Sequence, residues 1–98
     1  MTRLEIIANN TVEEDILDAL NRIEENFSYS RLNAVHGQGH SNPRRGDAVW
    51  PEENFIFIIY TDDETAKKFV EAVCKIKLNF IQEGIKIFAI PIENALDF

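Results

Sequence analysis

The sequence contains one cysteine, Cys74, among its 98 residues. One cysteine excludes an internal disulfide framework and a zinc site made of cysteines alone. No apolar run approaches the roughly 20 residues needed to cross a bilayer, and the first five residues lack the apolar stretch of a signal peptide. These absences predict a protein of the reducing cytoplasm that does not insert into a membrane.

Basic side chains are also scarce, because 10 lysines and arginines stand against 17 acidic residues, for a net charge of −7. A nucleic-acid backbone repels such a chain, so we expect no nucleic-acid partner. The acid concentrates between residues 13 and 25. Residues 26–46 contain no Asp or Glu and carry Arg31, His36, His40, Arg44 and Arg45. This distribution favours a small anion or an acidic partner at the acid-free segment, and the alternative is a polar loop without a ligand.

Apolar residues recur with two different periods along the chain. Runs with strand character span residues 4–8, 31–36, 55–60 and 85–90. After the first run, helical spacing predicts a helix of about four turns, capped by Thr11 with Glu14 completing a capping box. A second helix is expected to begin at Asp62 or Asp63 and to end at Gly84. The predicted order of elements is therefore βαββαβ.

This order is typical of the ferredoxin-like sandwich, an α+β fold in which a four-stranded antiparallel sheet carries two helices on one face. The length suits a single domain spanning residues 1–98. A long loop at about residues 37–51 holds three of the four glycines. Because connections of this length are uncommon in compact domains, we expect the loop to be functional or disordered.

The strands of such a sandwich should alternate apolar and polar side chains, because the helices cover only one face of the sheet. The run from Phe55 to Tyr60 does not alternate, and Ile7, Phe88 and Ile90 also break the pattern on their strands. An uncovered apolar face of this size exceeds what soluble monomers usually expose. We therefore predict symmetric self-association through the sheet, and the alternative is a surface that docks a different protein.

The segment Val35-His36-Gly37-Gln38-Gly39-His40, taken with the element order, resembles the nitrogen-regulatory PII and PII-like signalling proteins. Gly37 and Gly39 match the Gly-x-Gly that opens the family's long signalling loop, and Asp62-Asp63 and Lys86-Ile87-Phe88 also match. The resemblance implies a cytoplasmic homotrimer in nitrogen regulation, without enzymatic activity. It would bind a small anionic effector in clefts between subunits and regulate a protein partner through the loop at 37–51.

The predicted ligand-binding residues are Gly37, Gly39, Arg44, Arg45 and Lys86. Paired glycines let backbone amides approach an anion closely, and arginine forks clamp carboxylate or phosphate. Lys86 matches the lysine that faces a nucleotide phosphate in the family, which makes an adenine nucleotide a candidate effector. The segment Gln82–Ile85 has fewer glycines than the family's phosphate loop, so the effector stays open.

His36 and His40 are candidate metal ligands, with Asp47 or a neighbouring subunit completing the set. The segment Ile87–Ile92 also looks like the end of the CutA divalent-cation tolerance proteins, another trimeric branch of this fold. A CutA-like divalent-metal-binding protein is therefore the alternative function. No nucleophile has an assignable general base, and Cys74 is expected to be a buried, unreactive thiol.

Overall fold

The computed structural model describes residues 1–35 and 53–93 of the chain. Its elements are β1 (Thr2–Asn9), the 3-10 helix η1 (Asn10–Val12), α1 (Glu13–Ile23), β2 (Ser30–Val35), β3 (Asn54–Thr61), α2 (Asp63–Asn79) and β4 (Lys86–Pro91). Apart from the short η1, this is the predicted βαββαβ order. The long loop expected at about residues 37–51 lies outside the described residues.

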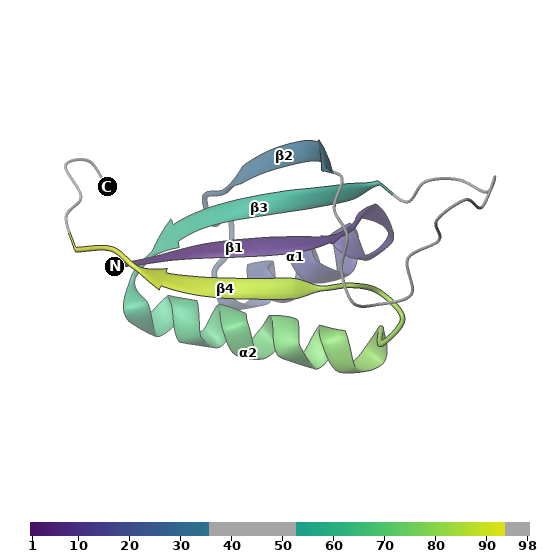
Figure 1. The fold of residues 1–98 in the computed structure, drawn as a ribbon. Coiled ribbons are helices and arrows are strands. Elements are labelled where there is room, and N and C mark those ends of the chain that lie inside the picture. Colours follow the sequence, from purple (N-terminus) through teal and green to yellow (C-terminus); the bar gives the residue numbers. More distant parts are fainter. Residues whose placement is uncertain (36–52, 94–98) are drawn as a thin grey trace.

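The four strands form one antiparallel sheet in the order β2-β3-β1-β4, and both helices lie against the same face of it (Figure 1). β1 is central and pairs with β3 on one side and β4 on the other, so that Ile7 stands opposite both Ile56 and Lys86. β2 and β4 are the two edge strands. The predicted ferredoxin-like sandwich is therefore confirmed.

The hydrophobic core fills the space between the sheet and the helical layer. Alternate residues of β1 and β3 point into it, because successive side chains of a strand face opposite sides. The buried strand residues are Leu4, Ile6, Ala8, Phe55, Phe57 and Ile59. The helices contribute Ile16 and Leu20 from α1 and Ala66, Phe69 and Val73 from α2, at the spacing of one helical stripe. The residues that alternate with them on β1 and β3 consequently face away from the helices.

The start and end of α1 differ from the prediction. The predicted capping box of Thr11 and Glu14 is absent, because α1 begins without a side-chain cap. The cap lies earlier, on η1, where the Oδ1 of Asn9 accepts a hydrogen bond from the Thr11 backbone N–H at 2.8 Å. Asparagine makes such local turns readily, and η1 results before α1 begins. The helix ends at Ile23, and Asn26 adopts a positive φ of 57°, a conformation that asparagine tolerates. Phe27 is buried against the core from the chain beyond the helix.

The second helix begins as predicted and ends earlier. The Oδ1 of Asp62 accepts a hydrogen bond from the Thr65 backbone N–H at 2.8 Å, and its Oδ2 accepts one from the Thr65 hydroxyl at 2.9 Å. These bonds stabilise the carboxylate and hold the pKa of Asp62 below its ordinary value. α2 ends at Asn79, not at Gly84. The buried side chain of Ile85 then fixes the connection just before β4.

Candidate functional site

The face of the sheet that the helices leave uncovered is apolar, as the sequence predicts. We call it the open face, and its apolar side chains are Ile7, Leu32, Ile56, Ile58, Tyr60, Phe88 and Ile90. Leu32, Tyr60 and Phe88 are respectively 50%, 46% and 48% exposed. These residues come from all four strands, and Arg3 and Glu5 of the central strand β1 stand between the apolar side chains of β3 and those of β4. Such a surface is typical of an interface.

A polar cluster lies within the open face. Arg3 stands opposite Tyr60 on β3. Its Nε donates to the Oε2 of Glu5 at 2.8 Å, and its Nη1 donates to the Tyr60 hydroxyl at 2.6 Å. The bond to Glu5 raises the pKa of Arg3, so the guanidinium stays charged. Because these groups satisfy one another, the cluster can sit in an otherwise apolar surface without a stranded charge.

Lys86 is the only predicted ligand-binding residue within the part of the chain that the structure describes. It is exposed at the first position of the edge strand β4, opposite Ile7, and therefore lies on the open face at its margin. The buried Ile85 beside it holds the backbone at this point. Lys86 thus lies exposed at the margin of the open face.

Gly37, Gly39, Arg44 and Arg45, the other predicted ligand-binding residues, lie outside the described residues. The candidate metal ligands His36 and His40 lie outside them as well. Within residues 1–35 and 53–93, no three histidine, cysteine, aspartate or glutamate side chains come together as a metal site requires.

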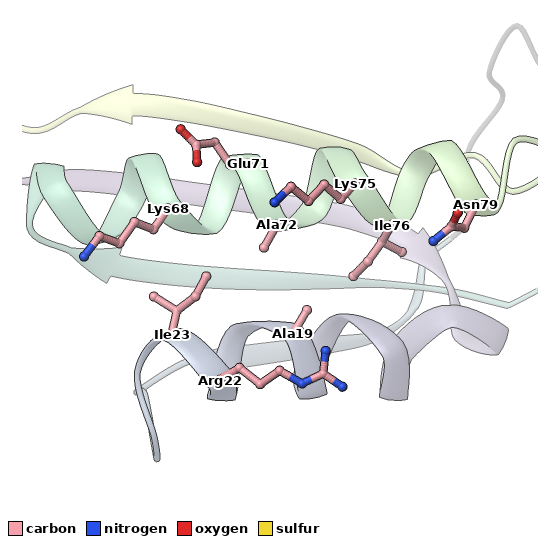
Figure 2. A pocket seen from close by; sticks show the side chains of 9 residues that line it. All are labelled: Ala19, Arg22, Ile23, Lys68, Glu71, Ala72, Lys75, Ile76 and Asn79. Carbon is pink, nitrogen blue, oxygen red and sulfur yellow. The ribbon is translucent and has the colours of Figure 1, made fainter.

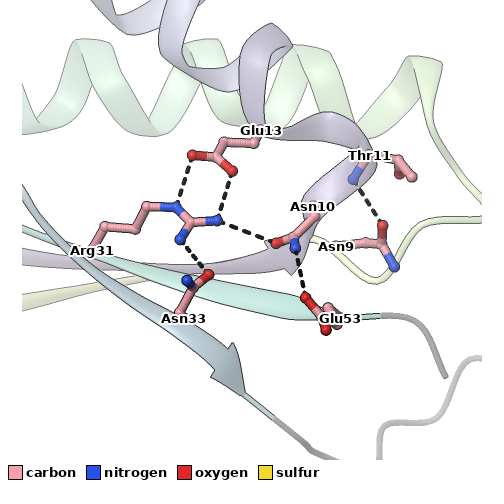
Figure 3. Close-up of polar contacts among 7 residues, drawn as sticks. All are labelled: Asn9, Asn10, Thr11, Glu13, Arg31, Asn33 and Glu53. Carbon is pink, nitrogen blue, oxygen red and sulfur yellow. Dashed lines mark hydrogen bonds and ion pairs between the residues drawn. The ribbon is translucent and has the colours of Figure 1, made fainter.

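A hydrogen-bonded network that the sequence did not predict holds β2 and Glu53, which flank residues 36–52 in the chain (Figure 3). The Nε and Nη2 of Arg31 on β2 donate to the two carboxylate oxygens of Glu13 on α1, each at 2.8 Å. Arg31 also donates to Asn33. Asn10 links the network to Glu53, because its backbone N–H donates to the carbonyl oxygen of Glu53 at 2.9 Å.

Arg31 is the centre of this network. Its guanidinium carbon lies 5.5 Å from the centroid of the Phe55 ring, and its Nη2 also donates to Asn10 Oδ1 at 3.4 Å. The hydrogen bonds to Glu13 raise the pKa of Arg31. The only sequence signal for this role is the position of Arg31 as the first basic residue of the acid-free segment. No spacing rule pairs it with Glu13, 18 residues away.

The predicted burial of Cys74 is wrong, because the thiol is exposed on α2. The buried stripe of that helix passes through Ala66, Phe69 and Val73, and Cys74 is rotated out of it. Among the described residues, no helix is both long and apolar enough to cross a membrane.

The fold and the open face together define a class of protein, the ferredoxin-like sandwiches that leave one sheet face available for association. The sequence profile described as "Nitrogen regulatory protein P-II" matches residues 1–97, and the chain belongs to this family. No match to a curated protein was found.

Solved structures of PII-like proteins share the fold. CPII from Thiomonas intermedia K12, in its structure bound to ADP and bicarbonate, superposes with a TM-score of 0.68 at 19% sequence identity, covering 90% of this chain and 81% of that chain. The apo form of CPII gives 0.64 at 17% identity, covering 90% and 84%. A PII-like signaling protein from Thermus thermophilus gives 0.64 at 16% identity, covering 90% and 82%.

Proposed function

We propose that this chain is a single-domain, non-enzymatic PII-like regulator of the cytoplasm that forms a homotrimer. It binds a small anionic effector in the clefts between subunits and regulates a protein partner through its loop at about residues 37–51. The observation that carries the proposal is the open face, an apolar surface spanning all four strands and left uncovered by the helices. Association with sister chains removes that surface from water.

The composition of the open face supports association with identical copies. Its margins carry large apolar side chains that are about half exposed, such as Leu32 on β2 and Phe88 on β4. Its charged members are mostly paired within the chain, because Arg3 binds both Glu5 and Tyr60. A surface with satisfied polar groups and exposed aromatic side chains has the composition of a protein interface.

The position of Lys86 supports an anion site at the margin of the open face. When a second chain covers that face, an edge lysine lies beside the junction rather than in the apolar centre. Related CPII structures contain ADP and bicarbonate or ADP, AMP and bicarbonate, so these three compounds are the first ligands to test. Gly37, Gly39, Arg44 and Arg45 would complete the site from the adjoining loop.

The network around Arg31 supports a signalling role for the segment between β2 and β3. Arg31 and Asn10 fix β2 and Glu53 to the start of α1. The strand ends at which residues 36–52 leave and re-enter the sandwich are therefore held at defined positions. A loop that must present itself to a partner needs such a fixed base.

Titration calorimetry tests the proposal with ADP, AMP and bicarbonate, singly and in pairs. We expect saturable heat with at least one of them, and a loss of binding in Lys86→Ala. Lys77→Ala is the matched control, because Lys77 is an exposed lysine on α2. Silence across the panel, or equal binding by both variants, removes the effector claim. The alternative, divalent-metal binding, predicts that His36→Ala takes up less zinc or copper than wild type in equilibrium dialysis. Unchanged uptake refutes metal binding through His36.

A further inference from the structure

A groove runs between α1 and α2 on the outer surface of the helical layer (Figure 2). It lies on the opposite side of the molecule from the open face, since both helices cover the other face of the sheet (Figure 1). Its volume is about 460 Å³. The groove therefore stays accessible when the open face is covered by sister chains.

The groove has an apolar floor. Ala19 on α1 and Ala72 on α2 line it, and their small side chains leave space between the two helices. Ile23 and Ile76, both partly buried against the core, extend the floor in either direction. An apolar strip between two helices is a surface into which the side chains of a third helix can pack, ridge into groove.

The rim of the groove is basic. Lys68 and Lys75 extend from α2, and Arg22 extends from α1 on the other side (Figure 2). Within the described residues, none of these three cations forms an ion pair. Glu71 is the only acid that lines the groove, and its carboxylate points away from α1. Three of the chain's 10 basic side chains thus gather at one groove although the net charge is −7.

We propose that this groove docks an acidic amphipathic helix of a partner protein. Apolar side chains of that helix would lie on Ala19 and Ala72, and its carboxylates would pair with Arg22, Lys68 and Lys75. From Lys68 to Asn79 the groove follows α2 for about 16 Å at 1.5 Å per residue, which matches about three turns of a docked helix. Recognition of this type combines an apolar stripe with flanking charge.

The shape and charge of the surrounding surface favour a helix over a broad anionic surface. The groove is confined to the line between two helices, whereas a membrane or a nucleic acid presents many charges over a wide area. Next to the groove, the first turns of α1 expose Glu14, Asp15 and Asp18. These carboxylates repel a polyanion that spreads over the first turns of α1, whereas a helix lying along the groove would place its carboxylates nearest to Arg22, Lys68 and Lys75.

Fluorescence anisotropy of a labelled synthetic peptide tests the inference on the full-length chain. The probe is a peptide of about 15 residues, long enough to form helix, with leucines at helical spacing along one face and glutamates on the others. We expect saturable binding that weakens with salt. The double variant Lys68→Glu/Lys75→Glu should bind about tenfold more weakly, because it replaces two attractive charges by two repulsive ones.

Two further variants separate the groove from diffuse electrostatics. Lys67→Glu/Lys77→Glu makes the same charge change at exposed positions of α2 outside the groove and should bind as wild type does. Ala72→Leu fills the floor without changing charge and should weaken binding as strongly as the rim variant. Equal losses in both charge variants, undiminished binding by Ala72→Leu, or absence of any binding each overturn the inference.

The controls also separate this inference from the proposed function and from other partners. Tighter binding to phosphatidylserine vesicles than to the peptide, abolished by the rim variant, assigns the groove to membranes and overturns the inference. The molecular mass of wild type is measured in the same samples. If wild type has the mass of a trimer and does not bind the peptide, docking in the groove is refuted and the proposed regulatory function is unaffected.

Discussion

Replacement of Phe88 by alanine tests whether the open face is an interface. Phe88 is 48% exposed, and an aromatic side chain carries about 150–250 Å² of surface, so about 100 Å² of it meets water. Covering that area contributes about 2.5 kcal/mol at about 25 cal/mol per Å². With alanine most of this is lost, roughly 2 kcal/mol per chain and roughly 6 kcal/mol per trimer. The equilibrium constant for dissociation into three chains should therefore rise by about four orders of magnitude. Because that constant scales with the square of concentration, the midpoint of dissociation should move to concentrations about two orders of magnitude higher.

Light scattering after size-exclusion chromatography measures this shift over a dilution series. The matched control is Leu78→Ala, which removes a large apolar side chain that is 74% exposed on α2 and leaves the open face intact. Circular dichroism should show both variants folded, because neither side chain belongs to the buried core. If wild type has the mass of one chain at micromolar concentration, or if Phe88→Ala keeps the wild-type mass throughout, the reasoning is refuted.

Three further outcomes follow from the fold. Phe57→Ala should lower the free energy of unfolding by about 3–5 kcal/mol in a urea titration, because it empties a fully buried site; a smaller loss contradicts the packing described for the core. The pKa of Asp62 is lowered by Thr65, so its stabilising effect is present above the ordinary value of 3.8 and is lost as pH falls through the lowered value. Thermal melts of wild type and Asp62→Ala should accordingly differ at neutral pH and converge in acid, and a constant difference contradicts the cap. Arg31→Met and Glu13→Gln should each lower the melting temperature, with non-additive effects in the double variant, because the two residues share one ion pair. Strictly additive effects would contradict an energetic coupling between the two side chains.

The order of elements and the apolar open face could be predicted because both depend on the spacing of apolar residues within short segments of the sequence. The uninterrupted apolar run Phe55–Tyr60 predicts that both faces of its strand are apolar, whichever strands pair with it. The cap at Asp62 likewise depends on a residue only three positions away, Thr65. Local chemistry of this kind is visible in a single sequence.

Features that depend on competition or on distant contacts could not be predicted. Asn9 and Thr11 are both good capping residues, and Asn9 is the one that caps because β1 ends there and η1 follows directly. The exposure of Cys74 depends on the rotation of α2 over the sheet, where a shift of one residue turns a side chain by about 100°. Arg31 and Glu13 meet only after β2 and α1 have packed. The basic groove needs two helices side by side, which no window of sequence contains.

The cluster of Arg3, Glu5 and Tyr60 has a consequence for how sister chains would align. A uniformly apolar interface allows one chain to slide or rotate against the next, because the hydrophobic effect has no direction. A guanidinium, a carboxylate and a phenol held to one another at 2.8 and 2.6 Å do not, because a misplaced neighbour would dehydrate the donors and acceptors that are left over from these mutual bonds. These three groups would act as a key that sets the orientation of each copy and rejects related proteins whose matching positions differ.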